Sequence, residues 1–561
     1  MIMGGPERQV TNRDVAERLA FMARLLEITG ENRHRIAAYE RAARQVERLS
    51  FPVAGLDEEE LTRIPGIGDR VAGQIREIAA TGTFQELKDL QATIPGSLVE
   101  LLGVAGVGPR TLHTLYKRLG IQSLDDLEQA AKGHRLRALP GFGAKKEEAI
   151  KKGIRQFRRR SDRMTRPQVD AVLESVAALL MDGDYVVAGS YRRGSSTVGR
   201  IEIVATGDRK TLVNRIPAEA VAGESAGEVS ISLAGAGVNV RFTEAGRCGT
   251  ALLCATGSRG FLDRLTEVAL ARGYRLGRDG LLDSSDGRLH TFESEEEVFS
   301  FLGMAAVPPE LREDRGEIEL ALRHALPDLV DLHGVRGDLH AHTTWSDGHQ
   351  SLDDVAEAGD ARGYEYIVVT DHSSRVRPGA LARQQAEIEL TNRRHACQLL
   401  SGTEVDIKSD GTLGYENRVL ADLDVVIASV HSGFAQDQDV LTRRVLTAME
   451  NEHVDIIGHP TGRLLGRRPP YAINLGRVTA HAAETRTALE INASPHRLDL
   501  EDIYIRHAKK EGVKLAAGTD AHRTGEFSNM RYGIMLARRG WCASDDIVNT
   551  FSLAGLLEWV S

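Results

Sequence analysis

From residue 337 onward, the chain alternates short, mainly apolar runs with stretches of helix length, and most runs carry a histidine or aspartate at or near their end. Such runs are typical of parallel strands, which are buried on both faces and joined by crossover helices. Seven units in succession predict a parallel sheet closed into a (β/α)7 barrel, with an open doubly wound sheet as the alternative. The runs are GDLHAH, YEYIVVTDH, LLSGTEVDI, DVVIASVHS, VDIIGHP, ALEIN and KLAAGTDAH.

Nine polar residues at or near the ends of these runs form a candidate catalytic site. The carboxyl ends of all strands in a parallel barrel meet on one face, so ligands far apart in sequence come together there. One such histidine alone is most simply explained as a buried structural residue, but nine at corresponding positions predict a divalent metal centre. The nine are His340, His342, Asp347, His372, Glu404, His431, His459, Asp520 and His522.

A metal centre of this composition predicts hydrolysis of phosphoesters. Metal ions lower the pKa of a water ligand to about 7 and neutralise phosphate oxygens, so no side-chain nucleophile is needed. Arg463 and Arg467 follow His459 in the segment HPTGRLLGRR and are candidates to hold a substrate phosphate. The alternative for both arginines is a solvated loop.

The N-terminal part, residues 10–160, has the periodicity of helices and contains three G-x-G turns, IPGIG, VAGVG and LPGFG. A turn of this kind at a helix start presents backbone N–H groups to a phosphate oxygen, although it can also simply join two packed helices. Three copies beside the basic segment 151–166 favour sequence-independent binding of the DNA backbone. The candidate DNA-binding glycines are Gly66, Gly68, Gly106, Gly108, Gly141 and Gly143.

Charge is divided unevenly along the chain. Its formal net charge is −9, but residues 1–166 hold 29 Lys and Arg against 22 Asp and Glu, and the remainder holds 42 against 58. An excess of basic charge attracts phosphate, whereas an acidic remainder suits metal coordination. The sequence thus predicts nucleic-acid binding at the N-terminal end.

Composition indicates a multidomain globular protein. The 561 residues, 42% of them hydrophobic, correspond to about three to four domains. No run reaches the roughly 18 apolar residues of a membrane span, and the first residues, MIMGGPERQVTNRD, lack the apolar segment of a secretory signal. Four cysteines without metal or disulfide spacing suit a reducing compartment, so we expect a cytoplasmic protein without membrane contact.

The segments that carry a family resemblance are GENRHRIAAYERAARQVERLS, the three hairpins and GSYRRGSSTVG at residues 189–199. With them the chain resembles, over its whole length, the bacterial family X DNA polymerases with a C-terminal PHP (polymerase and histidinol phosphatase) domain. The resemblance implies helix-hairpin-helix domains, an α/β nucleotidyltransferase-like palm and a thumb before the barrel. The expected limits are 1–90 (lyase-like), 91–165 (fingers), 166–250 (palm), 251–305 (thumb), 306–336 (linker) and 337–561 (PHP).

The palm departs from the family pattern. The family has two aspartates one residue apart, in G-D-I-D, and a third on a neighbouring strand; this chain has GRIE at 199–202 and Asn239. Because one carboxylate of three remains, Glu202, we expect it to form an ion pair with Arg200 rather than hold two metal ions. Polymerase activity is therefore expected to be lost or severely impaired.

Other features of the palm leave nucleotide binding open. Gly189, Ser190 and Arg193 match the family's triphosphate-binding turn, so dNTP is a further expected ligand. In the alternative interpretation, Glu244 or Asp208 replaces the missing aspartates, and the palm works with Mn²⁺ or Mg²⁺.

The PHP resemblance implies a cluster of three ions, Zn²⁺ or Mn²⁺, and a way of sharing the ligands. One ion would be held by His340, His342, Glu404 and Asp520. Glu404 would bridge to a second ion held with His431 and His459, and Asp347, His372 and His522 would hold the third.

The family also implies a function in DNA repair. We expect an enzyme that binds gapped, nicked or broken DNA and processes 3′ ends by 3′–5′ exonuclease or phosphodiesterase activity. The alternatives are a working gap-filling polymerase with an exonuclease, a non-catalytic module that binds DNA ends, and a small-molecule phosphomonoesterase. The first lysine is Lys88, so no Schiff-base lyase activity is expected in the N-terminal domain.

Overall fold

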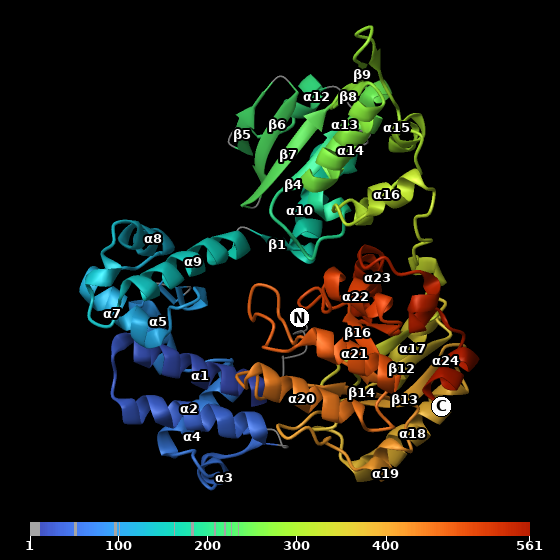
Figure 1. Ribbon diagram of the computed structural model, residues 1–561. Coiled ribbons are helices and arrows are strands. Elements are labelled where there is room, and N and C mark those ends of the chain that lie inside the picture. Colours follow the sequence, from blue (N-terminus) through green and yellow to red (C-terminus); the bar gives the residue numbers. More distant parts are fainter. Residues whose placement is uncertain are drawn as a thin grey trace, which may run out of the picture. The chain divides into compact units, whose positions relative to one another are not determined.

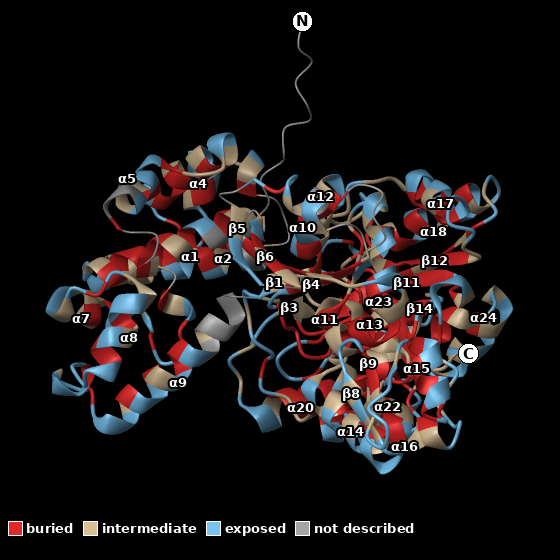
Figure 2. Ribbon diagram, turned by 90° about the horizontal axis from the view of Figure 1, so that it is seen from above, coloured by how far each residue is buried: buried red, intermediate tan, exposed pale blue. Residues whose placement is uncertain are grey.

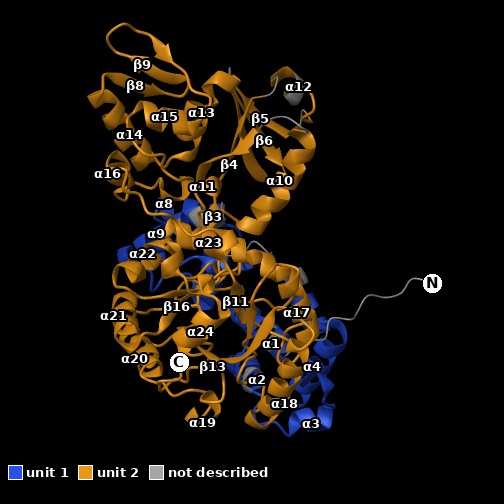
Figure 3. Ribbon diagram, turned by 90° about the vertical axis from the view of Figure 1, so that its right-hand side faces the viewer, with its two compact units in different colours: residues 1–162 blue, residues 163–561 orange. Residues whose placement is uncertain are grey.

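A computed structural model describes residues 12–49, 53–94, 98–99, 101–161, 163–180, 185–206, 209–217, 220–225, 227–233 and 235–561. The chain divides into two compact units, residues 1–162 and 163–561 (Figure 3). No described helix is both long enough and apolar enough to cross a bilayer.

The described part of the first unit is helical, and apolar residues at helical spacing form one core that includes Leu19, Tyr39 and Val46 (Figure 1). Its helices are α1 (Asn12–Thr29), α2 (Arg33–Arg48), η1 (Val53–Gly55), α3 (Glu58–Thr62), α4 (Asp69–Thr81), α5 (Gln85–Thr93), η2 (Leu101–Gly103), α7 (Pro109–Leu119), α8 (Leu124–Lys132), η3 (Leu136–Ala138) and α9 (Ala144–Ser161).

The three G-x-G turns lie where the sequence placed them, each before a helix. The first glycine of each turn has a left-handed backbone, with φ of 92° at Gly66, 90° at Gly106 and 79° at Gly141, a region that favours glycine. The second glycine directly precedes α4, α7 or α9. Each turn therefore ends at a helix N-terminus, as a phosphate-binding hairpin requires.

The third turn is secured by a buried carboxylate. Glu147 of α9 is 1% exposed and accepts hydrogen bonds from the Arg137 side chain (2.7 Å from Nη2 to Oε1) and backbone N–H (3.1 Å), and it pairs with His134 at 2.8 Å. The hydrogen bonds from Arg137, followed by the bond from His134, lower the pKa of Glu147 to about 2 against the effect of burial.

The second unit begins with the segment expected as the palm. Its sheet has the order β2-β4-β7-β6-β5, and the parallel pair β4–β7 sets Glu202 directly opposite Asn239. The palm elements are β1 (Met164–Thr165), α10 (Arg166–Leu180), β2 (Tyr185–Val187), α11 (Gly189–Arg192), β3 (Thr197–Val198), β4 (Ile201–Ala205), α12 (Arg209–Val213), β5 (Val221–Glu224), β6 (Glu228–Leu233), β7 (Ala236–Phe242) and η5 (Ala245–Arg247).

The thumb follows, and the segment expected as a linker packs against it. Leu311 and Ile318 share the thumb core, and buried Arg312 pairs with buried Glu295. The elements are α13 (Cys248–Thr256), α14 (Arg259–Ala271), β8 (Tyr274–Gly277), β9 (Gly280–Asp283), β10 (Leu289–His290), α15 (Glu295–Phe301), η6 (Pro309–Leu311), α16 (Glu317–Leu322) and η7 (Leu332–Gly334).

The C-terminal part is a parallel sheet with strand order β11 to β17. The backbone N–H of Asp520 donates to His340 O at 2.9 Å and that of His342 to Ala521 O at 2.8 Å, so the last strand end returns to the first. The predicted (β/α)7 barrel is confirmed, and it is distorted because β15 has only two residues. Figure 2 shows its strands as buried, which explains why they are mainly apolar.

The strands are β11 (Gly337–Ala341), β12 (Tyr366–Val369), β13 (Gln398–Asp406), β14 (Val425–Ser429), β15 (Ile456–Ile457), β16 (Ala488–Asn492) and β17 (Leu515–Gly518). The helices are α17 (Leu352–Asp360), α18 (Pro378–Asn392), α19 (Asn417–Leu420), α20 (Gln438–Met449), α21 (Leu475–Thr485), α22 (Asp502–Lys510), η8 (Thr524–Asn529), α23 (Met530–Arg539), η9 (Ser544–Asp546), η10 (Val548–Thr550) and α24 (Leu553–Val560).

Candidate metal centre

All nine residues predicted from the strand ends come together at the carboxyl face of the barrel. Each lies near the end of a strand or in the loop that follows it, which is where a parallel barrel gathers side chains. They are His340 in β11, His342 and Asp347 after it, His372 after β12, Glu404 in β13, His431 after β14, His459 after β15, and Asp520 and His522 after β17.

Glu404 is the centre of this cluster. Its Oε1 lies 2.9 Å from His459 Nε2 and 3.1 Å from His431 Nε2. Its Oε2 lies 2.8 Å from His372 Nδ1. One carboxylate thus faces imidazoles from three different strand ends, which is the arrangement of a bridging ligand.

A second group of ligand atoms lies on the other side of Glu404. Asp520 Oδ1 is 3.2 Å from His342 Nε2 and 3.8 Å from His340 Nε2. Glu404 Oε2 completes this group at 3.6 Å from His340 Nε2 and 3.7 Å from His342 Nε2.

The third group is formed around Asp347. Its Oδ1 lies 3.5 Å from His522 Nε2 and 3.6 Å from His372 Nε2. His342 also has a ring nitrogen close enough to join this group, and His372 also belongs to the group around Glu404. His342 and His372 therefore each belong to two ligand groups, and the nine residues do not divide into three separate sets.

The burial of the cluster fits bound cations. The Nε2 atoms of His340 and His342 are buried and have no hydrogen-bond partner, a costly state that a metal ion would relieve. Glu404 is 1% exposed, whereas His372 is 19% and His522 33% exposed. The site therefore has a buried floor and a side open to a substrate.

Two carboxylates outside the nine orient the histidine rings. Glu490 Oε1 accepts from His340 Nδ1 at 2.6 Å, and Asp406 Oδ1 accepts from His431 Nδ1 at 2.7 Å. Such partners fix the ring nitrogen that faces the metal. Sequence analysis missed both. The available signals were the position of Asp406 two residues after Glu404 on one strand, and Glu490 in the run ALEIN, which supplied none of the nine.

Two of the nine residues have a strained backbone. His459 has φ of 27° and Asp520 has φ of 55°, a region that costs a non-glycine residue about 1–3 kcal/mol. Hydrogen bonds hold both in place: the N–H of His459 donates to Glu490, and that of Asp520 donates to His340 O.

The carboxylates and imidazoles of the cluster shift one another's pKa values. Burial alone would raise the pKa of the Glu404 carboxyl, but the imidazoles of His431, His372 and His340 lower it well below its usual range. Burial, assisted by neighbouring His372, lowers the pKa of His342 to about 3. Against the effect of burial, Glu404 and Asp406 raise the pKa of His431 to about 10, and Asp347 and Asp520 raise that of His522 to about 9. A metal ion bound to these rings would displace their protons.

Comparison with known proteins agrees with this division of the chain. Residues 10–84 match a helix-hairpin-helix domain, and residues 98–156 match a tandem of such motifs. Residues 251–313 match the DNA polymerase beta thumb, and residues 338–494 match the PHP domain.

The relatives include one that spans nearly the whole chain. The DNA polymerase/3′-5′ exonuclease PolX of Bacillus subtilis is 34% identical over 560 residues, covering 96% of this chain and 98% of its own length. The chain belongs to the bacterial family X DNA polymerases with a PHP domain. A probable phosphatase of Thermoanaerobacter is 29% identical over 226 residues, 38% of this chain and 89% of its own length. DNA polymerase lambda of Arabidopsis thaliana is 29% identical over 204 residues, 35% of each chain.

For a family X palm, the metal-binding position of this chain is unusual. Glu202 accepts a hydrogen bond from Asn239 Nδ2 at 2.9 Å. The expected ion pair with Arg200 is wrong: among the described residues no such pair forms, because Asn239 is the residue opposite Glu202 in the sheet. Glu244 is 78% exposed and pairs with Arg247 at 3.4 Å, and Asp208 lies outside the described residues.

The expected triphosphate-binding turn of the palm is occupied by protein contacts. Gly189 and Ser190 begin α11, and Gly189 has φ of 66°. Arg193 pairs with Glu313 at 2.9 Å and donates to Thr256 O at 2.7 Å. A triphosphate at this turn would have to compete with Glu313 for the guanidinium.

The arginines near the PHP cluster differ in their environment. Arg463 is buried, and its guanidinium donates to Arg497 O and Leu498 O and pairs with Glu501, so its N–H groups are already engaged by protein. Arg467 is exposed. Arg497, which sequence analysis did not select, donates from Nε to Asp520 Oδ2 at 3.2 Å, and its buried Nη1 has no hydrogen-bond partner.

Proposed function

We propose that this protein removes nucleotides from the 3′ ends of DNA during repair, as a metal-dependent 3′–5′ exonuclease or phosphodiesterase whose catalytic domain is the PHP barrel. The convergence of nine ligand residues on one face of the barrel carries this proposal. In the palm, by contrast, one carboxylate of three remains. The printed name of the Bacillus subtilis relative, which includes a 3′–5′ exonuclease, supports the same reaction class.

The nine side chains are proposed to hold three divalent ions, Zn²⁺ or Mn²⁺. Glu404 would be shared between two of these ions, since its two oxygens face different sets of imidazoles. His342 and His372 lie between groups and are shared. Glu490 and Asp406 hold the outer nitrogens of two rings, so that the inner nitrogens face the ions.

The residues of the barrel have separate tasks in the proposed reaction. Bound ions supply a nucleophilic water at neutral pH and offset the charge of the phosphate. Partly exposed His372 and His522 border the side where a DNA end enters. Arg497, with a free guanidinium nitrogen beside Asp520, is placed to donate to a phosphate oxygen. Exposed Arg467 contacts the phosphate farther along the strand.

The hairpins of residues 1–90 and 91–165 are proposed to hold gapped, nicked or broken DNA. A Cβ atom added at Gly68, Gly108 or Gly143, none of which has a left-handed backbone, would meet no protein atom within 4 Å. Packing within the protein therefore does not explain the glycines, whereas close approach of a phosphate backbone does. Residues 166–336, the palm, thumb and linker, connect these hairpins to the PHP barrel along the chain. We place the reaction in the cytoplasm, where a bacterial chromosome lies.

We further propose that the palm retains at most weak polymerase activity. Glu202 is held by Asn239 rather than by a second carboxylate, and Arg193 is paired with Glu313. A gap-filling polymerase is the second candidate, supported by the thumb match and by the name of the Bacillus subtilis relative.

A single assay tests both parts. The purified protein is incubated with a 5′-labelled primer in a gapped duplex, with dNTPs and Mn²⁺, and the primer is resolved on a denaturing gel. We expect a shortened primer with wild type and with the control His453→Ala, whose ring lies outside the cluster, and an intact primer with His342→Ala. Shortening that survives His342→Ala would refute the catalytic site, and a lengthened primer would refute the impaired palm.

A further inference from the structure

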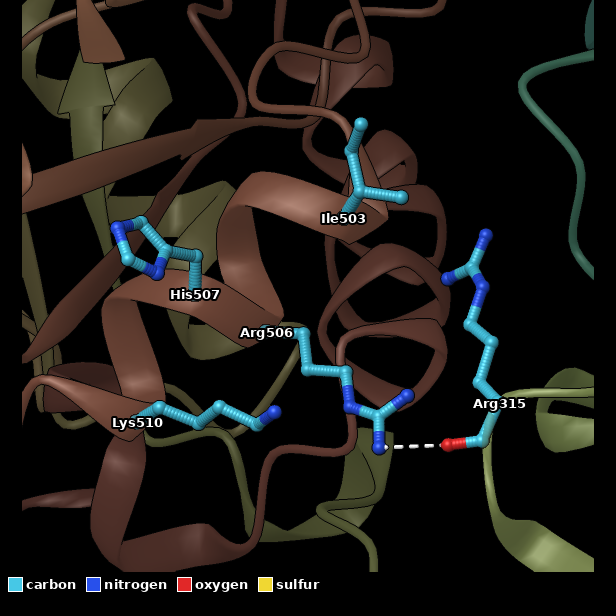
Figure 4. A pocket seen from close by; sticks show the side chains of 5 residues that line it. All are labelled: Arg315, Ile503, Arg506, His507 and Lys510. Atoms are coloured by element: carbon cyan, nitrogen blue, oxygen red, sulfur yellow. Dashed lines mark hydrogen bonds between the residues drawn. The ribbon is translucent and has the colours of Figure 1, made fainter. Parts of the chain in front are cut away.

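A basic pocket of about 320 Å³ lies outside the metal centre, between α22 and the segment that precedes α16. Figure 4 shows the side chains that line it: two guanidinium groups, one ammonium, one imidazole and one apolar side chain. The five residues are Arg315, Ile503, Arg506, His507 and Lys510. Among the described residues, no carboxylate lines this pocket.

The two arginines are held in place by contacts that leave their charge largely unbalanced. Arg506 Nη2 donates to the backbone oxygen of Arg315 at 2.9 Å, and its guanidinium lies 3.9 Å from the centroid of the Trp541 ring. Arg315 pairs with Asp502 at 2.9 Å, but Asp502 also pairs with Arg539 at 2.7 Å. One carboxylate thus serves two guanidinium groups.

Among the residues that the structure describes, no ion pair joins Arg506 or Lys510 to a carboxylate, whereas His507 Nδ1 lies 4.0 Å from Glu511 Oε1. Burial, and then the charge of Arg315, lower the pKa of Arg506. The carboxylate that opposes this effect, Glu317, accepts the backbone N–H groups of Asp314 and Arg315 at 2.7 and 2.6 Å. The pocket therefore favours an anion.

Helix stability alone does not explain this arrangement. Cations in the last turn of a helix interact favourably with its C-terminal end, which accounts for His507 and Lys510. The same argument does not apply to Arg315, which comes from a different segment, and Arg506 lies one residue before this last turn. Two segments nearly 200 residues apart in sequence contribute guanidinium groups to one pocket.

We propose that this pocket binds the phosphate groups of nucleotides, either in the backbone of a DNA strand or in a free nucleotide. Guanidinium groups match the geometry of phosphate oxygens, and Ile503, which is 47% exposed, offers an apolar contact to a sugar or base. The inference rests on the proposed function in one respect, that DNA is the substrate. A strand bound there would be anchored to the same barrel that holds the metal centre.

Fluorescence anisotropy tests whether the pocket binds the backbone of a DNA strand. It measures the binding of a 5′-labelled single-stranded oligothymidylate of about 20 nucleotides over a range of salt concentrations. The full-length protein carries His342→Ala so that the strand is not digested. We expect Lys510→Glu and Arg506→Gln each to weaken binding about 5- to 20-fold at low salt and to reduce the salt slope by about 0.7 per lost phosphate contact. The control Arg443→Glu, which makes the same charge change as Lys510→Glu on exposed α20 surface, should weaken binding less than about 2-fold.

Calorimetric titration with dAMP tests, in the same variants, whether the pocket binds a free nucleotide. Weaker DNA binding assigns the pocket to the strand backbone, and loss of dAMP binding with unchanged DNA binding assigns it to a free nucleotide. Lys510→Glu removes no ion pair or hydrogen bond that the structure shows. If this variant changes neither DNA binding nor dAMP binding, the proposal is wrong. A primer that is not shortened in the gapped duplex would instead refute the proposed reaction, and the binding results would stand independently.

Discussion

Replacement of Glu490 by glutamine tests whether the carboxylates behind the histidines hold the metal centre together. Glu490 Oε1 accepts from His340 Nδ1 at 2.6 Å, and Oε2 accepts from the His459 N–H and from Asn492 Nδ2 at 3.2 Å. Glutamine has the same shape but turns one of these acceptors into a donor. At least one buried N–H then faces another donor, which costs about 1–3 kcal/mol.

The same change weakens metal binding. Loss of an outer carboxylate of this kind lowers metal affinity about 10- to 100-fold, which corresponds to about 1.4–2.7 kcal/mol. We expect Glu490→Gln to need 10- to 100-fold more Mn²⁺ for half-maximal exonuclease activity. The maximal rate at saturating Mn²⁺ should fall by less than about 5-fold, because none of the nine ligands is removed.

The assay is a Mn²⁺ titration of exonuclease activity after removal of bound metal, combined with elemental analysis of the purified protein. The matched control is Asp455→Asn. Asp455 is a partly buried carboxyl of the same barrel whose pKa burial raises to about 7 and which accepts from the N–H of Val426. An unchanged Mn²⁺ requirement in Glu490→Gln would refute the reasoning, as would equal effects of both substitutions.

Three further predictions concern the phosphate contact, the third hairpin and the palm. Arg497→Met should lower exonuclease kcat/KM about 100-fold with unchanged metal content, since it removes a donor beside Asp520; unchanged kinetics would exclude this role. Glu147→Gln should lower the Tm of the first unit at pH 7, followed by circular dichroism. Because the pKa of Glu147 is lowered to about 2, its contribution is present above about pH 4.5 and is lost as the pH falls towards 2. A difference in Tm that does not shrink over that window would contradict this account. Arg200→Asp combined with Asn239→Asp should raise dNTP incorporation in Mn²⁺ at least about 10-fold, because it restores carboxylates next to Glu202; no gain would mean that other palm contacts are also lost.

Ion pairs and a hydrogen bond join the palm to helix α23 of the barrel. Glu313 pairs with Arg193 of the palm turn and with Arg539 of α23 at 2.9 Å each. Arg531 and Tyr532 of the same helix contact Asp170 of α10. Arg193, which matches the family's triphosphate contact, is therefore part of the contact between palm and barrel. Its substitution would affect both the palm turn and that contact.

Much of the fold and of the site follows from the sequence alone. The apolar runs predict the barrel because strands buried on both faces exclude polar residues, and the nine ligands stand out because they interrupt these runs at their ends. The hairpin glycines and the missing palm aspartates are likewise local patterns, in which the residue type and its spacing carry the chemistry.

The tertiary structure decided which residues support and complete the site. Glu490 reaches His340 across 150 positions of sequence. Arg463, which was predicted to hold a phosphate, is engaged by backbone carbonyl groups, whereas Arg497, which was not predicted, borders Asp520. The sharing of His342 and His372 between ligand groups was also not foreseen. The physical reason is common to all three cases: the partners of a buried polar group are set by the packing of segments distant in sequence, and no local pattern encodes that packing.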